Sequence, residues 1–159
     1  MLRSRWSPGP AGAPSSADRS GPDGVGGAEH ARGGPLVVSV TDFTSDAYRH
    51  LPGIARHGFA LRRLWPRLDG AVGMWLWAAP ALRRCGSVSV WTGRRALAGF
   101  VRLPEHVAIM DAYRERGAIR SVVLEYDGFD PARIRQDADA WLMPDDHHRG
   151  ARGAPRRRG

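Results

Sequence analysis

"GSVSVWTGRRALAGFVRLPEHVAIM" (residues 86–110) begins with alternating small and apolar residues and then changes to a helical pattern. The alternation predicts a strand, because successive side chains of a strand point to opposite faces. Ser87, Ser89 and Trp91 then share one face, and two valines share the other. The stretch therefore begins with a strand of two unlike faces. One face is apolar, and the other carries two serines followed by a tryptophan.

The second half of the stretch predicts two helical pieces. Thr92 can cap a helix that opens directly after it, and Pro104 suits the first turn of the next piece. On that next piece His106 shares a face with the residues three, four and seven positions further along. A histidine on an inward apolar face is either a hydrogen-bonded core residue or an acid–base group or ligand in a cleft. The residues that share its face are Ile109, Met110 and Tyr113.

Outside this stretch the same patterns predict three further strands and two further helices. The first helix carries Arg49, Arg56, Arg63 and Arg67 mostly off its apolar stripe. Thr44 or Ser45 can cap it, and Asp130 is expected to cap the last helix. The predicted strands cover residues 35–43, 69–80, 87–91 and 118–129, and the predicted helices cover 46–68, 94–116 in two pieces, and 130–142.

The strand predicted over residues 69–80 is rich in aromatic residues. Two tryptophans on one face beside a glycine indicate a bulky core or a second pocket wall. On the last strand Glu125 and Tyr126 fall on opposite faces, so one of them points toward the helices. In residues 69–80, parity places Val72, Met74 and Leu76 on one face and Gly73, Trp75 and Trp77 on the other.

The order β-α-β-β-α-β followed by a C-terminal helix is the split βαβ, ferredoxin-like pattern. It predicts an α+β fold with a four-stranded antiparallel sheet and two helices on one face. By this count the other sheet face is uncovered, and an apolar face of that size normally finds a partner. We therefore expect a homodimer in which two such sheets pack face to face.

The chain has 159 residues, which supports one folded domain over residues 35–143. Residues 1–34 are rich in Gly, Pro, Ser and Ala, and residues 144–159 are rich in Arg, so both flanks are predicted to be disordered. The net charge is +8, but it comes from arginine in a chain without lysine, a composition typical of a GC-rich genome. No aromatic residue interleaves the arginines of the tail, so we do not expect a nucleic-acid partner.

Several function classes are disfavoured by what the sequence lacks. Cys85 is the single cysteine, so no intramolecular disulfide forms and a cytoplasmic location is expected. No apolar run is long enough to span a membrane. His50 and His57 are too far apart for a helical metal pair, and no metal site is predicted. The phosphate-binding, zinc-protease and serine-hydrolase motifs are absent.

Trp91, Thr92, Phe100 and His106 resemble the strand tryptophan, capped helix start, aromatic residue and helical histidine of the dimeric α/β-barrel superfamily. The likeness is to the antibiotic-biosynthesis-type monooxygenases, which are related to heme-degrading and spheroidene-monooxygenase-like proteins, and it covers residues 36–126. It implies a homodimeric barrel with a cleft between each sheet and its helices. Some members oxygenate polycyclic aromatic molecules without metal or flavin, and others bind heme and degrade it.

The resemblance also implies roles for particular residues. Trp91 would pack on the substrate, and His106 would act as a base, or as the iron ligand if heme binds. Relatives commonly use an asparagine from the first strand, and this chain contains none. Ser39, Thr41 or Asp42 would then take its place. The expected substrate-binding residues are Ser87, Ser89, Phe100, Met110 and Tyr113.

Two functions follow from these observations. The first is a monooxygenase-like protein that oxygenates an apolar aromatic or conjugated small molecule, with no cofactor, or with heme as the second choice. The second is a non-catalytic homodimer, with a small-ligand-binding or structural role, that has lost the catalytic asparagine.

Overall fold

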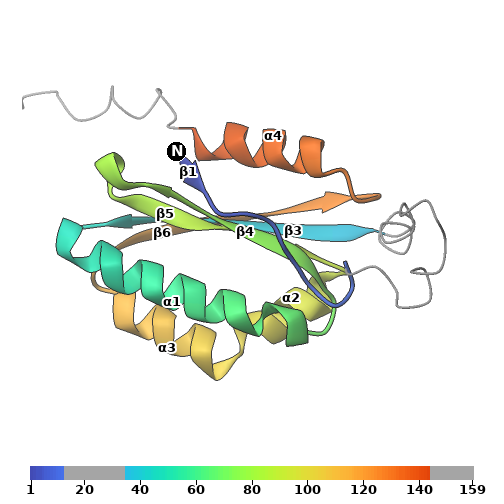
Figure 1. The fold of residues 1–159 in the computed structure, drawn as a ribbon, viewed down its shortest axis with the longest axis horizontal. Coiled ribbons are helices and arrows are strands. Elements are labelled where there is room, and N and C mark those ends of the chain that lie inside the picture. The colour runs from blue at the N-terminus through green and yellow to red at the C-terminus, as the bar shows by residue number, and fades with distance from the viewer. Residues whose placement is uncertain (13–34, 144–159) are drawn as a thin grey trace, which may run out of the picture.

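The structure is a computed structural model that describes residues 1–12 and 35–143. Its centre is a sheet of four long antiparallel strands, with two short N-terminal strands added beside β4 (Figure 1). The strand order is β1-β4-β5-β3-β6, and β2 also pairs with β4. The strands are β1 (Leu2–Arg3), β2 (Ser7–Pro8), β3 (Leu36–Ser45), β4 (Ala71–Ala79), β5 (Arg84–Trp91) and β6 (Gly117–Tyr126).

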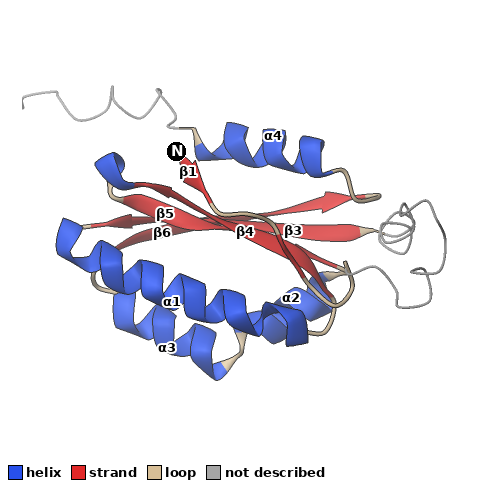
Figure 2. Ribbon diagram, in the orientation of Figure 1, coloured by secondary structure: helices blue, strands red, loops and turns tan. Residues whose placement is uncertain are grey.

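Helices cover both faces of this sheet (Figure 2). Three helices lie on one side and α4 lies on the other. This arrangement confirms the predicted α+β, ferredoxin-like fold with its four-stranded antiparallel sheet. The helices are α1 (Leu51–Leu64), α2 (Arg94–Val101), α3 (Pro104–Tyr113) and α4 (Pro131–Leu142), with 3₁₀ turns η3 (Tyr48–His50), η4 (Trp65–Arg67) and η5 (Pro80–Leu82).

The sheet face opposite α1–α3 is not uncovered, which corrects the sequence-based prediction. Helix α4 places an apolar stripe with four-residue spacing against it, so that Ile134, Ala138 and Leu142 are buried there. Asp130 caps α4 as predicted, accepting hydrogen bonds from the next two non-proline backbone N–H groups at 3.0 Å each. The strand residues buried under α4 are Leu36, Val38, Val40, Val72, Trp75, Trp77, Val88, Val90 and Tyr126.

Residues 1–12 belong to the fold, although they lie in the leader predicted to be disordered. Their two short strands pair with β4, and Trp6 packs on Trp75 and Phe129 at ring-centroid distances of 5.2 and 5.6 Å. A side chain at Gly73 would run into the Trp6 ring, so the glycine makes room for this contact. A segment poor in apolar residues thus gains order from one tryptophan and an exposed strand edge. The rest of the predicted leader and the predicted tail lie outside the described residues.

A bulge in β4 changes the parity predicted for this strand. The register against β5 shifts between Ala71 and Gly73, which places Val72 on the α4 side with the tryptophans rather than with Met74. The predicted caps also differ. Thr44 and Ser45 still pair within β3, and Gly93, not Thr92, precedes α2 without a side-chain cap.

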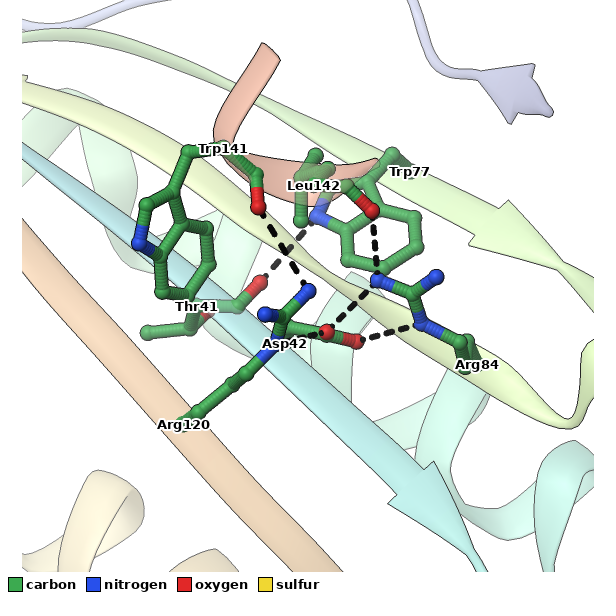
Figure 3. A network of polar contacts seen from close by, with 7 residues as sticks. All are labelled: Thr41, Asp42, Trp77, Arg84, Arg120, Trp141 and Leu142. Atoms are coloured by element: carbon green, nitrogen blue, oxygen red, sulfur yellow. Dashed lines mark hydrogen bonds and ion pairs between the residues drawn. The ribbon is translucent and has the colours of Figure 1, made fainter. Parts of the chain in front are cut away.

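A buried carboxylate joins three strands to the C-terminal end of α4 (Figure 3). Asp42 on β3 is 2% exposed and accepts hydrogen bonds from Arg84 on β5 at 2.7 and 3.1 Å and from Arg120 on β6 at 2.6 Å. The same arginines donate to the α4 carbonyls of Leu142, at 2.7 Å, and Trp141, at 3.5 Å. Cations at these carbonyls also complement the negative end of the helix dipole.

Replacing Asp42 with Ala should destabilise the protein by about 3 kcal/mol, because Arg84 would stay largely buried without its counter-charge. Urea unfolding of the variant checks this. The matched control is Glu125→Ala, which breaks the exposed Arg94–Glu125 pair and should cost below about 1 kcal/mol. Equal losses in the two variants would contradict the role assigned to Asp42.

Replacing Trp6 with Ala should lower the free energy of unfolding by about 2 kcal/mol, since the ring is partly buried against two aromatic residues. Thermal unfolding followed by circular dichroism measures the change. Leu2→Ala, at an exposed position of β1, is the control and should change little. An unchanged stability in the Trp6 variant would show that the N-terminal segment does not support the sheet.

Candidate active site

Hydroxyl side chains form a continuous strip on the sheet face below α1–α3. Register places Ser39 opposite Ser89 and Thr41 opposite both Ser87 and Ser121. The Thr41 hydroxyl lies 3.0 Å from the Ser87 hydroxyl and accepts from the Ser87 backbone N–H at 3.1 Å. We call these five residues the hydroxyl floor. Small polar side chains at the centre of a sheet face leave more room than the valines on the opposite face.

Trp91 closes one end of the hydroxyl floor. It is fully buried, and its indole N–H donates to the Ser89 hydroxyl at 3.0 Å. Trp65 and Phe100 pack against its ring at 4.7 and 5.1 Å. The Trp65 N–H is buried without an acceptor among the described residues. Trp91 thus lies on the predicted face of β5 with Ser89. The rings of Trp65 and Phe100 cover its indole, which is not exposed to solvent.

His106 extends the same aromatic group toward the surface. Its ring is half-buried and stands edge-on to Phe100 at 4.8 Å. Its Nδ1 lies 3.1 Å from the Val101 carbonyl oxygen, which can only accept, so Nδ1 carries a proton and Nε2 keeps a free lone pair. Burial lowers the pKa of His106 below its ordinary 6.5, and the Val101 hydrogen bond partly opposes this. The side chain is therefore a neutral base at neutral pH.

Tyr113 closes the other end of the hydroxyl floor. Its hydroxyl lies 3.2 Å from Nδ1 of His57 on α1, and its ring stands edge-on to Phe43 at 6.2 Å. Gly53 lets the hydroxyl approach α1, because a Cβ there would clash with it. Nearby, burial raises the pKa of Cys85 to about 11, so this thiol stays protonated. Sequence reasoning did not pair His57 with Tyr113, because their separation in the chain carries no local signal.

The predicted site residues thus fall into two groups on one sheet face. Ser89, Trp91, Phe100 and His106 are in contact at one end. Tyr113 lies at the other end, two helical turns along α3 from His106, and the half-buried Met110 lies on α3 between them. Ser87 belongs to the hydroxyl floor between the groups.

The β6 side of the floor is open. Ser121 is exposed, and Ile119 and Val123, on the same face, are 49% and 37% exposed. Tyr126 points to the opposite face, where it donates to Asp137 at 2.8 Å, and burial raises its pKa to about 12. Tyr126 is therefore outside this site, and the apolar rim on β6 offers the approach to it.

Two of the three proposed substitutes for the missing asparagine face the site. Ser39 and Thr41 belong to the hydroxyl floor. Asp42 points to the α4 side, where Arg84 and Arg120 occupy its carboxylate. A donor to a substrate oxygen from this strand would therefore be a hydroxyl group.

The residues around His106 do not form a heme cradle. Nε2 could serve as an axial ligand, but a porphyrin also needs a flat slot beside the imidazole. Phe100 occupies the space against this ring, and Trp91 and Trp65 are fully covered by protein, so they offer no surface for a porphyrin. Among the described residues, no three His, Cys, Asp or Glu side chains gather as metal ligands. No described helix is long and apolar enough to cross a membrane.

Comparison with known proteins supports the fold assignment. No family model and no curated sequence matches the chain. A candidate antibiotic biosynthesis monooxygenase from Nitrosomonas europaea is 12% identical over 60% of this chain and 92% of its own, with a TM-score of 0.51. A protein from Shewanella oneidensis is 13% identical over 60% and 94%, with a TM-score of 0.53. A cofactor-independent oxygenase from Streptomyces nogalater is 19% identical over 60% and 97%, with a TM-score of 0.47.

The two likenesses with TM-scores above 0.5 show that the chain shares the ferredoxin-like fold of these structures. At such low identity they establish the fold and not the reaction.

Replacing Ser89 with Ala should cost about 1–3 kcal/mol, because the Trp91 N–H would lose its acceptor inside the core. The control is a double-mutant cycle with Trp91→Phe, which removes the donor. Chemical denaturation of both single variants and the double variant should give a non-additive loss. Additive losses would show that the hydrogen bond does not fix Trp91.

Proposed function

We propose that this protein is a monooxygenase that binds an apolar aromatic or conjugated small molecule over the hydroxyl floor and oxygenates it without a cofactor. The observation that carries the proposal is His106, a neutral base held through Nδ1 beside an aromatic group, with no hydrogen bond to Nε2 among the described residues. A hydroxyl-lined face with aromatic residues at both ends suits a flat, weakly polar ligand. His106 and Tyr113 are seven residues apart on α3, about 10 Å along the helix axis, which suits an elongated ring system.

The proposed reaction begins with proton transfer. Nε2 of His106 takes a proton from an acidic carbon of the substrate, while Ser39 or Thr41 donates a hydrogen bond to the substrate oxygen on which negative charge develops. Phe100 limits the water around the imidazole. Trp91, which is covered by protein, supports Phe100 and the Ser89 hydroxyl instead of stacking directly on the ligand.

The substrate anion then supplies the electrons. The carbanion reduces O₂ and a C–O bond forms, giving a peroxide. The O–O bond breaks as the second hydrogen leaves the same carbon, and water departs. A methylene group and O₂ thus become a carbonyl group and H₂O, with O₂ as oxidant and the substrate as reductant.

The homodimer and the cytoplasmic location remain parts of this proposal. Self-association through an uncovered sheet face is no longer supported, because α4 and Trp6 cover that face. The backbone edge of β6 is a candidate surface for a second copy, since pairing along that edge leaves the face that carries Ile119 and Val123 free for ligand entry. Its test is the molecular mass in solution.

Oxygen uptake with an anthrone-type substrate should fall about 100-fold in His106→Ala, since general-base catalysis contributes on this scale. His50→Gln is the matched control. Nδ1 of His50 lies 2.9 Å from a carboxylate oxygen of Asp46, just before α1, and His50 makes none of the ring contacts that surround Trp91 or Tyr113. As the pH is lowered, the wild-type rate should stay constant past pH 6.5. It should decrease only when the pH reaches the lowered pKa of His106, because the imidazole then becomes protonated. Ligand binding without oxygen uptake would favour the non-catalytic function instead.

A further inference from the structure

We infer that the outer face of α1 is a docking surface for an anionic phospholipid bilayer. This inference is independent of the proposed reaction and uses none of the site residues. It rests on the charge, exposure and spacing of side chains on the first helix and its flanking 3₁₀ turns.

The sequence around α1 is basic and contains no acid. Residues 47–68 include five arginines and two histidines, with no Asp or Glu. Codon usage explains the choice of arginine over lysine, but it does not explain why five arginines gather in this one segment between Asp46 and Asp69. The segment is therefore a local concentration of positive charge.

Four of these arginines share one exposed face with Phe59. Helical periodicity places Arg56, Phe59 and Arg63 on the side opposite the partly buried residues of α1, and Arg49 and Arg67 continue this side into η3 and η4. All five are exposed, and Phe59 is 50% exposed. We call Arg49, Arg56, Phe59, Arg63 and Arg67 the α1 basic face.

Arg62 shows that not every arginine of α1 is free at the surface. Its guanidinium turns toward the N-terminal segment and donates to the Arg5 carbonyl at 3.2 Å and to the Ser7 hydroxyl. The neighbouring Arg63 makes no ion pair or side-chain hydrogen bond with any described residue. One of two adjacent arginines is therefore used in folding, and the other is left at the surface.

The α1 basic face is distinguished by its clustering. Arg95, Arg102, Arg116 and Arg135 are also exposed and have no carboxylate within 4 Å among the described residues, but they are spread over α2, α4 and the chain beside α3. Arg94, Arg114 and Arg133 each lie within 4 Å of a carboxylate, on Glu125, Asp111 and Asp137. The four arginines of the α1 basic face have no such partner among residues 1–12 and 35–143. Arg63, in the last turn of α1, and Arg67, in η4, are near each other in the chain, so their like charges repel. A bound polyanion would relieve this repulsion.

The chemistry of the face favours a bilayer over a nucleic acid. The face runs from residue 49 to residue 67, about 27 Å along a helical axis, on the outer layer of the molecule (Figure 1). Phe59 lies between Arg56 and Arg63, so its ring can enter the headgroup region while the guanidinium groups reach lipid phosphates. A single-strand binder would instead need several aromatic residues to stack successive bases, and this face offers one.

The test uses the full chain and sedimentation with vesicles of phosphatidylcholine, with or without phosphatidylglycerol. The wild type should bind only the anionic vesicles, and added salt should weaken binding. Arg56→Gln with Arg63→Gln should reduce partitioning by about 30-fold, since each basic residue near the surface contributes about fivefold. Phe59→Ala should reduce it by about tenfold.

The matched control is Arg114→Gln with Arg133→Gln, which removes the same charge from α3 and α4 and should change binding less than about twofold. Thermal unfolding checks that every variant is folded. An equal loss in the control pair would show attraction by net charge alone and overturn the assigned face. Failure of the wild type to bind anionic vesicles would also overturn it. So would tight binding to an oligonucleotide that depends on Arg56 and Arg63 but not on Phe59.

Discussion

Strand β3 is hydrogen-bonded on both sides, and its period-two alternation decides which side chains meet which helix layer. Val38 and Val40 are completely buried beneath α4. Ser39 and Thr41, between and beside them, face α1–α3. Because β5 and β6 follow the same alternation in register, one face of the sheet carries the apolar core under α4, with the Asp42 ion cluster at one end, and the centre of the other face carries hydroxyl groups. The candidate site exists only because these two faces are so different.

Much of the fold could be predicted, because its signals are local. The alternation around Ser87, Ser89 and Trp91 and the cap at Asp130 each depend on a few neighbouring residues. The missed features depend on contacts between distant segments. The sequence around Trp6 is too poor in apolar residues to predict order, and its partner Trp75 lies far along the chain. The β4 bulge likewise depends on pairing with β5 and not on a signal within β4.

The candidate site divides in the same way. The face of α3 that carries His106 and Tyr113 follows from helical spacing, so these residues could be named in advance. Their partners could not. Trp65 comes from η4 to cover Trp91, and His57 comes from α1 to meet Tyr113. Spacing can indicate that a side chain points inward, but only the packing of separate helices decides whether it meets a ligand or another side chain.

The ion cluster at Asp42 connects the two faces. Its arginines come from β5 and β6, so the cluster holds β3 to both neighbours at one defined register. The residue before Asp42 is Thr41, which points the other way and pairs with Ser87 in the hydroxyl floor. A one-residue slip of β3 would place the carboxylate among the helices on the site side and a hydroxyl beneath α4. The buried charge under α4 thus fixes the geometry of the site on the opposite face without contacting it.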